Sequence, residues 1–235
     1  MSDWKAKRFW KNAAVEKVDD GFAVLLDGRP VKTPAKRSLL LPTAKMAEVI
    51  AAEWNAQEDE INPHLMPATK TANSAIDKVA TQHAEVADML AAYGDSDLLC
   101  YRADHPEGLV ARQAEEWDPL LDWAASELGA RLEPRSGVIH VPQSPDALNV
   151  LSSRTHALSP FQLAAFHDLV SLSGSLVIGF AAAEGLRPLD DLWETSRLDE
   201  NWQAEQWGRD DEAEALAAVK KDSFRHAGHM FTLCC

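Results

Sequence analysis

The feature that most constrains the fold is an uncharged apolar segment of fifteen residues, 169–183. A helix that crosses a bilayer needs about 20 apolar residues, so this segment is too short for a membrane span and predicts a buried helix. It lies within residues 159–186, which we expect to form one helix. Ser159 is a natural N-cap, Pro160 suits the first turn, and Gly185 ends the element. Because this helix is apolar on nearly every side, we place it at the centre of a helical bundle.

The N-terminal part of the chain predicts short strands followed by a helix. The run GFAVLLDGRPVKT places β-rich stretches on either side of Asp27-Gly28, a dipeptide typical of tight hairpin turns. A further short strand, SLLLP, precedes a helix for which Thr43 is the natural N-cap. Later in the chain the apolar residues recur at the spacing of a helix, and we expect Gly94 and Gly129 to be helix C-caps.

These patterns predict an α+β fold. We expect a small N-terminal α/β domain with antiparallel strands in residues 1–66 and a mainly α helical bundle in residues 67–235. One β-like interruption, residues 137–142, is a candidate strand of the N-terminal sheet. No long linker rich in Gly, Ser or Pro separates the two parts, so we expect them to pack as one body.

The charge balance excludes several classes of partner. The chain has 37 acidic and 23 basic residues, a formal net charge of −14. Such a surface repels phosphates and anionic lipids, so nucleic-acid binding and membrane insertion are disfavoured. Three cysteines form no disulfide framework, which is typical of a reducing compartment. We therefore expect a cytoplasmic protein.

Motifs for cofactor chemistry are missing. The glycines form neither a dinucleotide fingerprint nor a phosphate-binding loop. One metal candidate stands near the C-terminus, where His226 and His229 share a helix face and Cys234 and Cys235 follow. A packed tail helix explains the same residues, and adjacent cysteines point in different directions on a helix. We therefore expect no metal and no cofactor.

Paired carboxylates leave an enzymatic alternative open. Asp95 and Asp97 are spaced as a general acid and base could be, although capping of the next helix explains them more simply. Together with Glu205 they define the alternative hypothesis, a small hydrolase or lyase that uses carboxylates. That hypothesis predicts a deep pocket lined by convergent polar groups.

A cluster of tryptophans and carboxylates lies in residues 189–207, which we expect to form one helix closed by Gly208. In that helix Leu198, Trp202 and Glu205 fall on one face. Glu205 thus shares a face with apolar groups and lies in the last turn, where the helix dipole disfavours a negative charge.

Two interpretations of Glu205 follow from this position. Its carboxylate either pairs with an internal arginine, such as Arg197 or Arg154, or recognises a protein partner. The neighbouring tryptophans favour recognition, because tryptophan is enriched at protein interfaces.

Four runs of sequence together resemble one protein family. In chain order they are KRFWKNAAVEKVDDGFAVLLDGRPVKTPAKRSLLLP, AAEWNAQEDEINPHLMPATKTANSAIDKV, GDSDLLCYRAD and WETSRLDENWQAEQWG. They are similar to the successive signatures of the assembly chaperones that handle the α subunit of the F-type ATP synthase catalytic head. The resemblance covers nearly the whole chain.

The resemblance implies the two-part fold, with the helical bundle orthogonal, and a binding protein without catalytic activity. Its implied partner is the unassembled α subunit, whose interface for the β subunit it shields until β subunits replace it. The family's Gln-x-Glu-x-Trp-Gly signature falls on Gln203, Glu205, Trp207 and Gly208, and its carboxylate is regarded as essential in the family. Trp202 and Asp199 of the same run complete the expected partner-binding residues. Mitochondrial members carry a targeting extension, whereas this chain enters RFWK almost at once, so we expect a bacterial, cytoplasmic member. We also expect a monomer.

Overall fold

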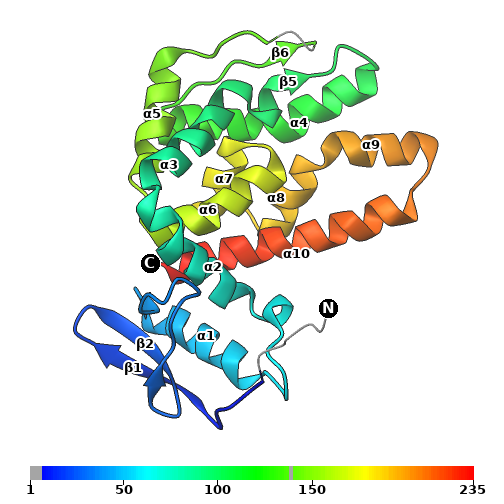
Figure 1. Ribbon diagram of the computed structural model, residues 1–235. Helices are drawn as coiled ribbons and strands as arrows, with labels where there is room; N and C mark the ends of the chain where they lie inside the picture. The colour runs from blue at the N-terminus through cyan, green and yellow to red at the C-terminus, as the bar shows by residue number, and fades with distance from the viewer. Residues whose placement is uncertain (1–6, 138–139) are drawn as a thin grey trace. The chain divides into compact units, whose positions relative to one another are not determined.

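A small antiparallel sheet forms near the N-terminus of the computed structural model, which describes residues 7–137 and 140–235 (Figure 1). Its strands are β1 (Ala13–Val18), β2 (Gly21–Leu26), β3 (Arg29–Pro30) and β4 (Leu40–Leu41). Strand β2 is central and pairs with each of the other three. The predicted hairpin turn is confirmed: Asp27 and Gly28 join β2 to β3 with φ angles of 48° and 82°. Both angles are positive, as a tight two-residue hairpin requires.

Helix α1 (Ala44–Asn55) packs on this sheet, against β1 and β2 (Figure 1). The predicted N-cap is confirmed, since the Thr43 hydroxyl accepts a hydrogen bond from the Met46 backbone N–H at 3.2 Å. Met46 and Ile50 lie one turn apart on the buried face of the helix. The Glu53 carboxylate of α1 then accepts hydrogen bonds from the first N–H groups of α2 (Pro67–Asp77), which joins the two helices.

The chain forms two compact units. The first is drawn from Met1–Gln82, Ser159–Ala165 and His229–Cys235, and the second from His83–Leu158 and Phe166–Gly228. The remaining α-helices are α3 (His83–Ala91), α4 (Glu107–Trp123), α5 (Pro145–His156), α6 (Pro160–Ser173), α7 (Leu176–Ala183), α8 (Leu189–Ser196), α9 (Leu198–Trp207) and α10 (Asp211–Leu233). Shorter turns of helix are η1 (Pro63–Leu65), η2 (Val79–Thr81), η3 (Ala92–Ser96), η4 (Leu98–Cys100) and the π-helical turn η5 (Ala124–Leu128). A small sheet followed by helices confirms the α+β fold, while the boundary at residues 66 and 67 stays a prediction.

The predicted helix over residues 159–186 is two helices, α6 and α7. The chain bends at Gly174, whose φ is 72°, and Ser175 starts α7 by accepting a hydrogen bond from the Ile178 N–H at 3.0 Å. Every residue of α7 from Leu176 to Ala182 is buried, as expected for a central helix. A Cβ on Gly179 would lie 2.7 Å from a methyl group of Val170, so glycine is required there for close packing.

The predicted helix over residues 189–207 is also two helices, α8 and α9, with the break at Arg197. Neither glycine nor proline marks this break. Instead, side chains bond the carbonyls at the end of α8: the Trp117 indole donates to the Thr195 carbonyl at 2.9 Å, and the Ser196 hydroxyl donates to the Trp193 carbonyl at 2.7 Å. These bonds satisfy groups that a continuous helix would have paired internally.

The two glycines predicted as C-caps differ. Gly129 has φ 75° and ends the π-helical turn, so the prediction is confirmed there. Gly94 lies inside η3, and the prediction is wrong there. A Cβ on Gly94 would lie 3.2 to 3.4 Å from methyl groups of Leu151, Leu148 and Leu176, so its glycine serves close packing.

The predicted strand 137–142 includes residues 138 and 139, which lie outside the described residues. Just before it, β6 (Arg135–Ser136) pairs in parallel with β5 (Tyr101–Arg102), and both strands belong to the second unit. Among the described residues no helix is long and apolar enough to cross a membrane.

We expect the Asp27 carboxylate to make the stability of the first unit depend on pH. Its carboxylate accepts hydrogen bonds from the Lys11 and Asn12 backbone N–H groups at 2.9 and 3.0 Å, and these bonds lower its pKa. A lowered folded-state pKa contributes stability above the ordinary value, and that contribution is lost as the pH falls through the folded pKa. Between about pH 5 and pH 3, the melting temperature of Asp27→Asn should therefore fall less than that of the wild type. Parallel curves for the two proteins would contradict this assignment.

Candidate functional site

Helix α9 packs on α4 through its inner face, and both helices belong to the second unit (Figure 1). Leu198 is buried at the start of α9. One turn later, the Trp202 ring covers the α4 backbone at Gly108, where an added Cβ would lie 2.8 Å from the ring. Glycine at this position therefore allows the indole to lie directly on α4.

Glu205 lies one further turn along the same inner face and pairs with Arg112 of α4. The Nη1 atom of Arg112 donates to both carboxylate oxygens, at 2.9 and 2.8 Å. The Glu205 side chain is 51% exposed and the Arg112 side chain is 39% exposed. The arginines suggested by the sequence are engaged elsewhere: Arg197 pairs with Glu200, and Arg154 with Glu184. Glu205 therefore has an internal arginine partner, but not one that the sequence indicated.

Asp199 makes a further contact between α9 and α4. It accepts a hydrogen bond from the Gln113 side-chain amide at 2.7 Å, and the amide oxygen of Gln113 accepts one from the Ala103 backbone N–H at 2.9 Å. Gln113 is buried, and its two hydrogen bonds link α9 to the segment that precedes α4.

The five residues predicted to bind a partner divide between two sides of α9. Trp202, Glu205 and Asp199 contact α4, as described above. Gln203 and Trp207 lie four residues apart on the outer side and are exposed, Trp207 by 80%. A tryptophan exposed to this extent is unusual, because burial of its large ring is favourable.

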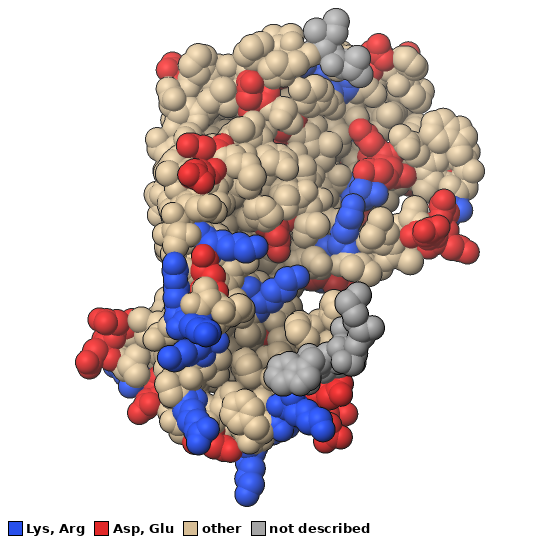
Figure 2. Space-filling model, viewed as in Figure 1, with Lys and Arg blue, Asp and Glu red and all other residues tan. Residues whose placement is uncertain are grey.

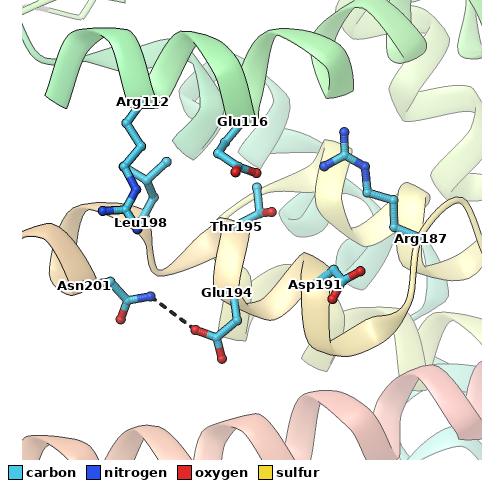
Figure 3. A pocket seen from close by; sticks show the side chains of 8 residues that line it. All are labelled: Arg112, Glu116, Arg187, Asp191, Glu194, Thr195, Leu198 and Asn201. Atoms are coloured by element: carbon cyan, nitrogen blue, oxygen red, sulfur yellow. Dashed lines mark hydrogen bonds between the residues drawn. The ribbon is translucent and has the colours of Figure 1, made fainter. Parts of the chain in front are cut away.

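A charged cleft of about 520 Å³ lies between α4, α8 and α9 (Figure 3). Its lining residues are Arg112, Glu116, Arg187, Asp191, Glu194, Thr195, Leu198 and Asn201. A second cleft of about 310 Å³ shares Arg112, Glu194 and Asn201 with the first and reaches Glu205. The Asn201 amide and Lys221 both bond the Glu194 carboxylate, at 3.2 and 2.6 Å. The Arg112–Glu205 pair therefore lies at the edge of a polar surface that carries both signs of charge. Figure 2 shows basic and acidic side chains next to one another on this part of the second unit.

Sequence reasoning missed Arg112 and the α8 carboxylates of this cleft. Arg112 and Glu205 are separated by 93 positions. No local motif surrounds Arg112, and on a helical pattern alone it resembles any surface arginine. Only the packing of α9 on α4 through Trp202 and Gly108 brings the two charges together.

The carboxylates of the enzymatic alternative lie in different environments. Asp97 is fully buried, and it accepts hydrogen bonds from the Leu99 and Val177 N–H groups and from the Ser175 hydroxyl. Burial raises its pKa against the effect of these bonds. It caps η4, as expected, and it also holds the start of α7. Asp95 is not a cap, contrary to the expectation: it lies within η3, lines a pocket of only about 10 Å³ and accepts a hydrogen bond from the Gln143 backbone N–H at 2.7 Å.

The C-terminal metal candidate has no support in the geometry. Within the described part of the chain, no group of three or more His, Cys, Asp or Glu side chains is placed to hold a metal ion. The Cys234 thiol instead donates to the Met230 carbonyl, and burial raises its pKa to about 12, which disfavours the thiolate that binds metals.

Comparisons with known proteins agree with this fold. A family model described as ATP12 chaperone protein matches residues 7–125. The crystal structure of Atp12 from Paracoccus denitrificans is 51% identical in sequence and has a TM-score of 0.96, covering 99% of this chain and 100% of that one. The structure of a mutant of P. denitrificans Atp12p is 50% identical, with a TM-score of 0.97 and full coverage of both chains.

A curated relative is more distant. The mitochondrial protein atp12 of Schizosaccharomyces pombe is 26% identical over 222 residues, which cover 89% of this chain and 76% of the relative. The fold and these similarities define a chaperone of the α+β class. The chain belongs to the ATP12 chaperone family, which is the ATP synthase assembly family that its sequence resembles.

Proposed function

We propose that this protein binds the unassembled α subunit of the F-type ATP synthase, shields the surface that will contact the β subunit, and is displaced as the catalytic head forms. The observation that carries the proposal is the full-length similarity to Atp12p, at 50% identity and a TM-score of 0.97. A role in shielding a surface requires binding and no chemical step, so we propose that the protein is not an enzyme.

The proposed contact surface is the outer side of α9. Trp207 supplies a large exposed apolar area, of the kind that provides most of the binding energy at protein interfaces, and Gln203 supplies a polar group beside it. Asp199, Trp202 and Glu205 complete the site from the side that faces α4. We propose that the protein acts as a monomer in a bacterial cytoplasm, whereas its curated yeast relatives are named as mitochondrial.

Charge is expected to set the rate of association. The second unit carries 26 Asp and Glu against 11 Lys and Arg. Charges around an interface mainly steer encounter, while buried apolar contacts set the dissociation rate. We expect the association rate with the α subunit to fall severalfold between low and physiological salt, with little change in dissociation, as measured by surface plasmon resonance. Equal association rates at both salt concentrations would show that the acidic surface has no steering role.

Affinity capture from a cell extract tests the partner. With the protein immobilised, mass spectrometry should recover the ATP synthase α subunit as the main specific protein. Recovery of unrelated proteins alone, from an extract in which the α subunit is abundant, would refute the proposal. A parallel capture with Trp207→Ala separates binding at α9 from binding elsewhere on the surface.

A further inference from the structure

We infer that Arg112 is a positioning residue for partner binding, which acts by holding Glu205 and the last turn of α9 against α4. This inference rests on the proposed function, because it concerns how the same surface of α9 is presented. Arg112 lies on α4, outside the signature that suggested the partner-binding residues.

The first observation is how little else holds the end of α9. Its first half is fixed by the buried Leu198, by the Trp202 ring on Gly108 and by the bond from Gln113 to Asp199. For residues 203–207, the pair with Arg112 is the only side-chain hydrogen bond or ion pair formed with the described residues. Among side-chain hydrogen bonds and ion pairs, one arginine therefore holds to α4 the turn that presents Gln203 and Trp207.

The second observation is the geometry of the pair. One nitrogen, Nη1, is shared between both carboxylate oxygens, so the other nitrogens of the Arg112 fork are not used by Glu205. About half of the Glu205 side chain remains in water. The carboxylate is thus held close to α4 while lone pairs stay accessible to a cation of the partner. Holding a long side chain before binding reduces the entropy lost at the interface.

The third observation explains why the pair matters more for binding than for stability. Ion pairs between exposed side chains contribute little to folding, typically about 0 to 1 kcal/mol. Removing Arg112 should therefore leave the fold intact while the end of α9 gains conformational freedom. A purely structural role would produce the opposite pattern, with melting temperature and binding falling together.

A double-mutant cycle tests the inference, with affinity for purified α subunit and melting temperature measured on each protein. The variants are Arg112→Gln, Glu205→Gln and the two combined. We expect each single variant to bind the α subunit about five- to tenfold more weakly than the wild type. The combined variant should bind no more weakly than the single variant of lower affinity, because both substitutions break the same ion pair. Arg112→Lys keeps the charge and should recover part of the affinity.

The matched control is Arg225→Gln, which removes another exposed arginine–carboxylate pair of the second unit, with Asp190. It should bind as the wild type does. Wild-type affinity in Arg112→Gln, independent additive losses in the combined variant, or binding losses that follow melting temperature across the Arg112 and Arg225 variants would each overturn the inference. Failure of the wild type to bind the α subunit would instead refute the proposed function.

Discussion

Trp207→Ala is expected to weaken binding of the α subunit by about thirtyfold or more while leaving the fold unchanged. A tryptophan at the centre of an interface typically contributes 2 kcal/mol or more when truncated to alanine, which corresponds to about thirtyfold in affinity. The side chain is 80% exposed in the free protein, so its removal creates no cavity. Surface substitutions of this kind usually change stability by less than about 0.5 kcal/mol. Isothermal titration calorimetry and thermal melting on the same preparation measure both quantities.

The control for this variant is Met89→Ala on α3, which removes another exposed apolar side chain of the same unit. It should bind the α subunit as the wild type does. If Met89→Ala and Trp207→Ala bound equally well, the outer side of α9 would not be the contact surface. If Trp207→Ala melted much lower than the wild type, its effect on binding would have a structural cause.

Of the substitutions predicted for this protein, Asp97→Ala is expected to lower the free energy of unfolding most, by about 2–4 kcal/mol. The carboxylate is fully buried and accepts bonds from the Val177 N–H at 3.0 Å and the Ser175 hydroxyl at 2.7 Å. Its removal leaves these donors in the core without an acceptor, and each unpaired buried group costs about 1–3 kcal/mol. The cost of burying the carboxylate, which raises its pKa, offsets part of this loss.

Urea unfolding measures the effect, and two further variants locate its cause. Asp97→Asn keeps an acceptor oxygen but turns an amide N–H₂ toward one of the donors, so its stability should lie between those of the wild type and Asp97→Ala. Asp122→Ala removes an exposed carboxylate of α4 and should cost less than about 0.5 kcal/mol. An Asp97→Ala protein as stable as the wild type would show that η4 and α7 do not depend on this carboxylate.

Local rules of sequence predicted the elements whose signals are themselves local. The hairpin at Asp27-Gly28, the cap at Thr43 and the helix end at Gly129 depend on a few neighbouring residues, and all three are present. The breaks at Gly174 and Arg197 were missed because they depend on tertiary contacts. In the first, Leu98 donates to the Gly174 carbonyl, and in the second the indole of Trp117 bonds the end of α8.

The candidate site shows the same division. Helical geometry placed Trp202 and Glu205 on one face of α9, and the structure agrees. The same geometry gave no information about which arginine meets Glu205, because the partner comes from another helix. Arg112 is selected by the crossing of α4 and α9, which depends on the absence of a side chain at Gly108.

The central claim is that the protein binds a free α subunit and gives it up to the β subunit. The most direct measurement mixes the purified protein with isolated α subunit, determines the mass of the complex by light scattering, and then adds β subunit. We predict a complex of one protein and one α subunit, which disappears when the β subunit binds, with the released protein recovered as a monomer. A protein that forms no complex with the α subunit, or that stays bound to it when the β subunit joins, would contradict the account.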